Sequence, residues 1–225
     1  MRIALELDWD RCPDGYEIVD YGEADPNAPM ISGVLTGKYV RPISDRREPV
    51  HRRIEDLGDA LVLNLVRWME RAPMKFIREH GLFGYGLLCT SGLDEMPLDD
   101  ILARRQHLHT LIQAKTEKWS AETVALMTNR GDARLGALTP ALTPQSDQGP
   151  LSLTLRVSNL YQFLRTEALL ILASEQRLML CAHCSTPFLA GTGRGSAGKR
   201  LDARTCSARC RVAAHRARQA AREIA

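Results

Sequence analysis

Four cysteines near the C-terminus have the spacing of metal ligands. Cys181 and Cys184 form one couple, and Cys206 and Cys210 form a second couple after the loop 185–205. Four thiolates arranged in two close couples can surround one Zn²⁺ tetrahedrally, and four cysteine ligands leave no position for a reactive water. The sequence therefore predicts one structural zinc ion, with His183 and His215 as the nearby alternatives to a cysteine ligand.

The segments around the cysteines predict how these ligands are held. Residues 177–180 read as a short strand that leads into the first couple, and Phe188 offers an apolar side chain beneath the metal. A spacing of four places Cys206 and Cys210 on one side of a helix, because each residue turns the helix by about 100°. Strand, cysteine turn, hairpin and a helix-borne pair, in this order, are typical of a treble-clef finger, here over residues 178–225.

The helix that follows Cys206 is predicted to carry a row of cations on one face. We call this row, which consists of Arg211, His215, Arg218 and Arg222, the cationic stripe. The stripe and the loop before it contribute the expected nucleic-acid contacts, which are Lys199, Arg200, Arg204, Arg211, His215, Arg218 and Arg222. Arginine suits bidentate contacts with phosphate or guanine. A row of alanines that includes Ala213, Ala217 and Ala220 lies on the metal side of this helix, where we expect it to pack. The alternative interpretation is that the stripe is solvated or faces a protein partner.

Charge is segregated along the chain of 225 residues. Residues 181–225 hold eight Arg and one Lys against two acids, a net charge of +7, whereas the whole chain carries +3. The remaining residues therefore sum to −4. This division predicts an electrostatic contact surface in the C-terminal part and a different role for the rest.

The rest of the chain predicts an α+β fold that is predominantly helical, with a few short strands. Alternating apolar residues indicate strands over 3–9 and 151–157, and apolar residues at three- and four-residue steps indicate a helix from His51 to before Pro73. The other expected elements are short strands around 16–21 and 33–40, a helix over 73–80, a long helix from Leu98 past Trp119, and a helix from Ser158, its N-cap, to Ser174. We expect a helical body over 1–135 that senses or dimerises, a linker or long loop over 136–150, and a strand, helix and finger over 151–225.

Composition also bears on the class of protein. No apolar run approaches the ~20 residues that cross a bilayer, and the N-terminus lacks the apolar segment of a signal peptide. Six cysteines, four of them in metal-ligand couples, fit a reducing compartment. We therefore expect a cytoplasmic protein with no membrane contact. No nucleophile–base pair or open metal site is visible, so we expect no enzyme activity.

The cysteine region resembles a known family. The residues that carry the resemblance are Cys181-x-x-Cys184, Phe188, and Arg204-Thr-Cys206-Ser-x-x-Cys210-Arg211 followed by Ala-x-Arg. This pattern is similar to the C-terminal finger of bacterial proteins with a CGNR-type zinc finger, although Arg211-Val212-Ala213 stands in place of Gly-Asn-Arg. The resemblance implies a helical N-terminal domain, one small finger, and a DNA-binding role in transcription regulation. As a separate expectation, the helical body forms a homodimer. The alternative is a protein-interaction or purely structural zinc module.

Overall fold

The computed structural model describes most of the chain as two compact units. The described residues are 3–22, 36–54, 57, 60–63, 65, 73–84, 95–120, 122–123, 139–144, 151–157, 159–191 and 202–224. The helices and strands among them are β1 (Ile3–Arg11), β2 (Tyr16–Asp20), β3 (Lys38–Pro42), β4 (Glu48–Ile54), α2 (Pro73–His80), β5 (Met96–Pro97), α3 (Leu98–Thr116), β6 (Thr139–Pro144), β7 (Leu151–Val157), α5 (Leu160–Ala173), β8 (Arg177–Leu180), β9 (Pro187–Ala190) and α6 (Ala208–Ile224). Both units are assembled from several separate segments.

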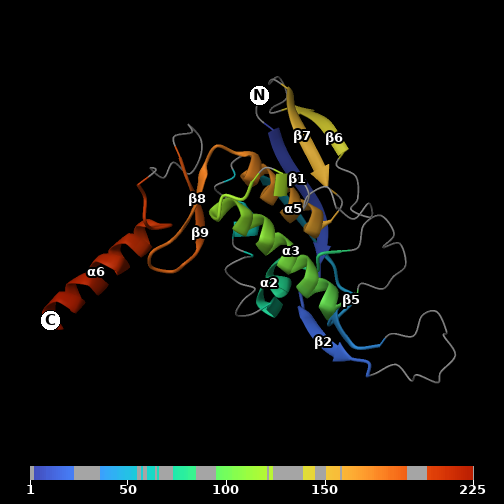
Figure 1. Ribbon diagram of the computed structural model, residues 1–225. Helices are drawn as coiled ribbons and strands as arrows, with labels where there is room; N and C mark the ends of the chain where they lie inside the picture. The colour runs from blue at the N-terminus through green and yellow to red at the C-terminus, as the bar shows by residue number, and fades with distance from the viewer. Residues whose placement is uncertain are drawn as a thin grey trace. The chain divides into compact units, whose positions relative to one another are not determined.

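The first unit, built from residues 1–53, 72–107 and 132–163, contains a four-stranded sheet. The strand order is β4-β1-β7-β6, with β1 parallel to β7 and β6 antiparallel to β7 (Figure 1). Strands β1 and β7 confirm the predictions over 3–9 and 151–157. Strand β6, however, lies inside the segment 136–150 that we expected to be a linker or loop, because its backbone pairs with β7 in spite of two prolines. An edge strand tolerates proline because its outer side forms no ladder.

The centre of this sheet contains a buried acid. Alternation along β1 predicts an exposed Glu6, but its residue is only 5% exposed. Its carboxylate accepts hydrogen bonds from Arg53 at 2.8 Å and Arg156 at 3.4 Å, from the strands on either side of β1. Arg156 is also its register partner on β7. Strand β1, which alternation predicts to be half-exposed, is therefore a central strand. Two guanidinium groups compensate the buried charge of Glu6.

A second sheet of the first unit has the order β2-β3-β5 and is antiparallel. Helix α2 confirms the prediction over 73–80. Its C-terminal carbonyls are satisfied by β1, because the indole N–H of Trp9 donates to His80 O at 2.6 Å and Arg11 donates to Glu79 O at 2.9 Å. Gly81 then leaves the helix with a φ of +89°, where an added Cβ would come within 3.4 Å of Trp9 Nε1. This position favours glycine because of its positive φ, while the added Cβ would be in ordinary contact with its neighbours.

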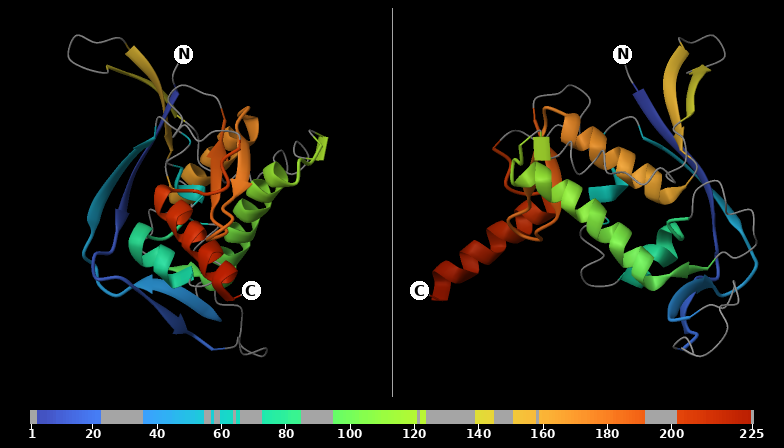
Figure 2. Two further views of the ribbon diagram at one scale, coloured as in Figure 1. Left: turned by 90° about the vertical axis from the view of Figure 1, so that its left-hand side faces the viewer. Right: turned by 45° about the vertical axis from the view of Figure 1, so that its right-hand side comes forward.

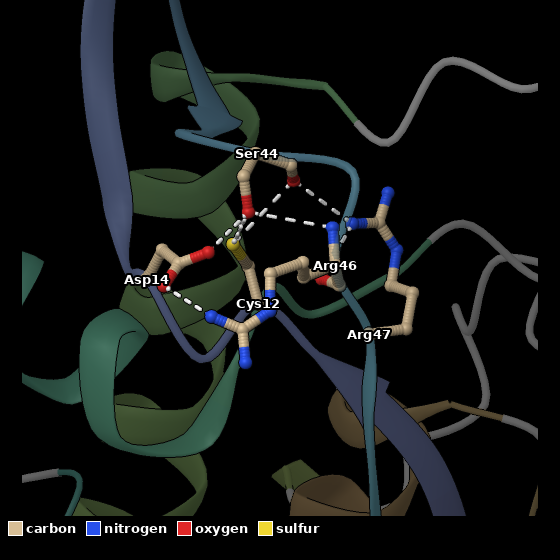
Figure 3. A network of polar contacts seen from close by, with 5 residues as sticks. All are labelled: Cys12, Asp14, Ser44, Arg46 and Arg47. Carbon is tan, nitrogen blue, oxygen red and sulfur yellow. Dashed lines mark hydrogen bonds and ion pairs between the residues drawn. The ribbon is translucent and has the colours of Figure 1, made fainter.

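Polar contacts tie the turn after β1 to the loop after β3 (Figure 3). The Ser44 hydroxyl donates to Asp14 at 2.6 Å, and Arg46 donates to the other oxygen of Asp14 at 3.1 Å. Cys12, 1% exposed, donates its thiol to Ser44 O at 3.5 Å. Burial raises the pKa of Cys12, but hydrogen bonds from Ser44 and the backbone outweigh it and lower the pKa below its usual value. Cys12 lies outside the cysteine group described below.

The second unit consists of residues 54–71, 108–131 and 164–225. Our prediction of a helix beginning at His51 is wrong, because residues 51–54 belong to β4 and the described helical residues begin at Leu61. Strand pairing with β1 outweighs the helical period at its start. The helix expected from Ser158 is α5, which begins at Leu160. Asn159 caps it by accepting from Gln162 N at 2.8 Å, while Ser158 lies outside the described residues.

The fold as a whole is mixed α and β. The described strands form sheets of four, three and two members, so a predominantly helical body is not confirmed. Helix α3 ends at Thr116, and Lys118 has a φ of +56°, so the helix does not extend past Trp119 as expected. The division into 1–135, 136–150 and 151–225 stays a prediction. Among the described helices, none is long and apolar enough to span a bilayer.

A buried carboxylate of α5 makes a testable contribution to stability. Glu167 is 0% exposed, and its two oxygens accept from the backbone N–H groups of Leu61 at 3.0 Å and Val62 at 2.7 Å, where a helical segment begins. Glu167→Gln replaces one accepting oxygen with an NH₂ group and leaves a buried N–H without an acceptor. We expect a loss of about 1–3 kcal/mol in the free energy of unfolding, measured by urea denaturation.

The matched control is Glu122→Gln at an exposed position of the same unit. Surface substitutions of this kind change stability by less than about 0.5 kcal/mol. Equal urea midpoints for the two variants would show that Glu167 does not cap the helical segment.

Candidate metal centre and cationic helix

The four cysteines predicted from their spacing come together in the second unit. The Sγ atoms of Cys181, Cys184, Cys206 and Cys210 all lie within 4.8 Å of one another and could hold a metal ion. Three of the separations are 3.5 Å for Cys184–Cys206, 3.5 Å for Cys206–Cys210 and 3.7 Å for Cys210–Cys184. A tetrahedron with metal–sulfur distances of about 2.3 Å has sulfurs about 3.8 Å apart. The donor atoms and their spacing therefore fit a tetrahedral thiolate site.

The first couple is held by a tight turn between two strands. Strands β8 and β9 pair antiparallel, with Leu180 opposite Pro187, and the turn 181–186 joins them. Within the turn, Ser185 N donates to Cys181 O at 2.9 Å and Cys181 N donates to Thr186 O at 3.0 Å. Ala182 N donates to Arg204 O at 2.9 Å, which fastens the approach to the second couple onto this turn. These backbone bonds bring the two couples together.

The second couple lies at the start of α6, beside the β8–β9 hairpin (Figure 2). Our expectation that both cysteines are helix-borne is wrong for Cys206, which precedes the helix. Ser207 caps α6, since its Oγ accepts from Cys210 N at 3.1 Å and its carbonyl accepts from Arg211 N at 3.1 Å. A capping serine between the two ligands fixes both the helix start and the position of Cys210 in its first turn.

An apolar cluster supports the cysteines. Phe188 is 4% exposed and packs in one cluster with Cys181 and Ala190, against which Met179 and Ala203 also lie. Phe188 was expected beneath the metal, and it does pack beside the ligands. The hydroxyl of Thr186 lies 3.0 Å from Cys184 Sγ. This group orients a ligand from outside the cluster, a position that the sequence pattern did not single out.

The surroundings of Cys181 and Cys206 shift the pKa values of their thiols in opposite directions. Burial raises the pKa of Cys181, but hydrogen bonds from the backbone of Cys206, Cys184 and His183 outweigh it and lower the pKa to about 6. Burial and the neighbouring sulfurs of Cys210, Cys184 and Cys181 raise the pKa of Cys206 to about 12. The thiolate of Cys181 is stabilised and that of Cys206 is destabilised, because like charges this close repel. A bound cation removes this conflict, since metal binding deprotonates thiol ligands.

The two histidines near the cysteines are exposed. His183 lies in the turn and His215 on α6, and neither belongs to the ligand group found among the described residues. The sulfur set is complete without them.

The structure describes the side chains of only some of the residues that we predicted to contact nucleic acid. Arg204, Arg211, His215 and Arg218 are exposed, and Arg218 Nε donates to Ala214 O at 3.3 Å. Arg222 lies on α6, but its side chain is outside the description, and Lys199 and Arg200 fall outside the described residues altogether. Within residues 202–220, none of the arginine side chains forms an ion pair with a described carboxylate.

Two further arginines of α6 are exposed, and the expected contact set omitted them. Arg209 and Arg216 are seven residues apart, as are Arg211 and Arg218. At about 100° per residue, each pair lies on one side of the helix, and the two pairs are about 160° apart. The helix therefore presents arginines on two flanks. The seven-residue spacing of Arg209 and Arg216 in the sequence already indicated this second flank.

The row of alanines does not pack as expected. Ala213 is half-buried, whereas Ala217 and Ala220 are exposed. Packing of α6 is therefore restricted to the turns next to the cysteines, and the described part of the helix beyond them is solvated. In the described part of α6, tertiary contacts are thus limited to the turns beside the cysteine cluster.

Comparison with known proteins returned no relative of this chain. No protein-family model matches it, and neither the curated proteins nor the solved structures contain a match. Function must therefore be inferred from the geometry of the site itself.

The metal centre makes a direct prediction about composition. The purified protein should contain about one equivalent of tightly bound metal by elemental analysis. Cys206→Ser removes a thiolate that links the loop to the turn, so we expect the metal content to fall close to zero and the helical circular dichroism of α6 to decrease. Cys12→Ser, which removes a cysteine outside the ligand group, should retain the metal. Full retention in Cys206→Ser would contradict this ligand set.

Proposed function

We propose that the metal is zinc and that residues 178–225 form a treble-clef-like finger of the CGNR type. Four thiolates in tetrahedral spacing suit Zn²⁺ in a closed structural site. The order of β8, cysteine turn, β9 and α6 supports the finger, as does Phe188 beside the ligands. A closed site gives the metal a folding role, so this proposal includes no catalytic activity.

We further propose that the finger binds nucleic acid, preferably duplex DNA, and that the protein is a transcription regulator. The observation that carries this proposal is the set of exposed arginines on α6, which have no carboxylate partner among the described residues. Helix α6 contains five arginines and one acid, Glu223. Such a surface releases counterions when it meets phosphates, and this is the main source of non-sequence-specific affinity.

The two flanks of α6 support a particular mode of contact. A helix that lies in the major groove has a phosphate backbone on either side, and the groove is about 12 Å wide. The pair Arg209 and Arg216 can face one backbone while Arg211 and Arg218 face the other. A single solvated stripe would not need arginine on both sides. The cysteine cluster at the N-terminal end supplies the rigid attachment that such a helix requires.

A protein partner is the second candidate function. Val212 is 51% exposed on α6, and Ala217 and Ala220 are exposed elsewhere on the same helix. Small apolar side chains of this kind allow close packing against another helix. The two candidates differ in their dependence on salt, because phosphate contacts weaken steeply as ionic strength rises.

The cationic stripe yields the decisive prediction. Replacing Arg211, Arg218 and Arg222 with Gln keeps helix propensity, since Gln and Arg are similar in this respect. The triple variant should keep its metal but bind duplex DNA more weakly. The slope of log affinity against log salt should become shallower by about 3 units, because each lost phosphate contact contributes about 0.9.

The matched control replaces Lys38, Arg46 and Arg78, exposed cations of the first unit, with Gln. It changes the net charge equally and should leave the slope within about 1 unit of the wild-type value. Equal slopes for the wild type and the α6 variant would contradict nucleic-acid binding and favour the protein partner.

A further inference from the structure

Strand β8 has one edge that no described strand covers. The order of its sheet is β8-β9, so β9 covers only one side of β8. Cys181 N donates to Thr186 O in the same register, which makes these two residues a hydrogen-bonded pair. Hydrogen-bonded and non-hydrogen-bonded pairs alternate along an antiparallel ladder. Met179 therefore turns its N–H and C=O toward β9, whereas its neighbours Leu178 and Leu180 turn theirs to the outer edge.

The outward backbone groups of β8 have no partner in the part of the chain that the structure describes. Neither Leu178 nor Leu180 forms a hydrogen bond with a described residue outside its own ladder. Pro187, opposite Leu180, has no N–H, which agrees with a pair that exchanges no hydrogen bonds. An edge with unpaired N–H and C=O groups is a template on which a further strand can pair.

A groove of about 1000 Å³ runs along this outer edge. It is lined by all four residues of β8 and by the C-terminal ends of α3 and α5, beside which β8 lies (Figure 1). Side chains alternate between the two faces of a strand, so a space that touches four consecutive residues meets the strand along its edge. No residue of the described strand β9 lines the groove. The groove therefore adjoins the edge that β9 leaves uncovered.

The other walls of the groove are mainly apolar. Leu169 and Leu172 line it from α5, and Trp119 lines it just beyond the end of α3. The indole N–H of Trp119 donates to Glu117 at 2.8 Å, which fixes the ring orientation. An extended segment as long as β8 measures about 13 Å, and its side chains point alternately to two faces. The apolar walls favour apolar side chains on one of these faces.

The charged residues of the groove favour an acidic partner. Lys115, Lys118 and Arg177 line it, against a single acid, Glu175. Lys118 and Arg177 are exposed, so both can meet a partner. Among the described residues, none of the three cations forms an ion pair with a carboxylate. The excess of positive charge attracts acidic side chains and disfavours basic ones.

We infer that the outer edge of β8 binds an extended, acidic segment of a partner protein, which adds a third strand to the β8–β9 sheet. The backbone of Leu178 and Leu180 supplies the hydrogen bonds of the new ladder. The leucine wall of α5 takes the apolar side chains of the segment, and Lys118 and Arg177 attract its acids. This surface is separate from α6, so the inference holds whether or not α6 meets nucleic acid.

The first test measures peptide binding to the full-length, metal-loaded protein by isothermal titration calorimetry. The probe is acetyl-Leu-Glu-Val-Glu-Leu-amide, and the matched peptide has Gln in place of both Glu. The Glu peptide should bind about fivefold more tightly, because exposed charge contacts contribute modestly. The double variant Lys118→Gln and Arg177→Gln should lose this preference. The control Lys38→Gln and Arg78→Gln, at exposed cations of the first unit, should keep it.

The second test detects the new ladder by amide hydrogen exchange in nuclear magnetic resonance spectra. Saturation with the Glu peptide should slow exchange of the Leu178 and Leu180 N–H groups by about tenfold or more, because both gain an acceptor. Met179 is the internal reference, since its N–H already faces β9 and its exchange should change less.

Two variants at one position separate the backbone contact from the side chain. Leu180 is 59% exposed, and its N–H points away from β9, so Leu180→Pro removes an outer donor while the β8–β9 ladder stays intact. Leu180→Ala removes most of the side chain but keeps the N–H. The proline variant should bind the Glu peptide about tenfold more weakly than the alanine variant, because a peptide carbonyl is left unpaired. Circular dichroism and metal content establish that both variants are folded.

Three results would overturn the inference. One is the absence of binding by the Glu peptide, and the second is binding that leaves exchange at Leu178 and Leu180 unchanged. The third is slow exchange at both positions before any peptide is added, which would show that a second copy or another part of this chain covers the edge. The exchange measurement uses the wild type, so it decides the question even if a variant fails to fold. Since no nucleic acid is present, the outcome is separate from that of the salt titration.

Discussion

The C-terminal part of this protein depends on the electrostatic conflict among four neighbouring sulfurs. Thiols gathered within 4.8 Å cannot all ionise without a cation, yet backbone hydrogen bonds already favour the thiolate of Cys181. A metal ion held by the four sulfurs would resolve the conflict and join the turn after β8 to the start of α6. The small cluster around Phe188 contributes too little apolar burial to hold these segments alone. The orientation of α6 and the exposure of its arginines follow from that link.

Strand β8 connects two surfaces of the second unit. Residues Arg177–Leu180 line the groove, which is also lined by residues from the C-terminal ends of α3 and α5, and the next residue is Cys181. The side chain of Met179 serves both regions, since it lines the groove and packs against the cysteine cluster. A molecule that orders β8 therefore acts on the segment that positions the first pair of sulfurs.

Buried acids have a consistent role in both units. Glu6 is compensated by two arginines of neighbouring strands, and Glu167 by two backbone N–H groups at a helical start. Each carboxylate joins segments that are far apart in the sequence, and each would be costly to bury alone.

The sequence alone determined features that depend on local chemistry. The cysteine spacing indicated the ligand set, and proline before and glycine after residues 73–80 delimited α2. Tertiary structure decided which partner each segment meets. Pairing with β1 places residues 51–54 in strand β4, where the periodicity predicted a helix. The strands on either side of β1 bury Glu6. The contact of the Thr186 hydroxyl with Cys184 left no sequence signal. Periodicity records which side chains need burial, whereas the partners that bury them come from distant segments brought together only by folding.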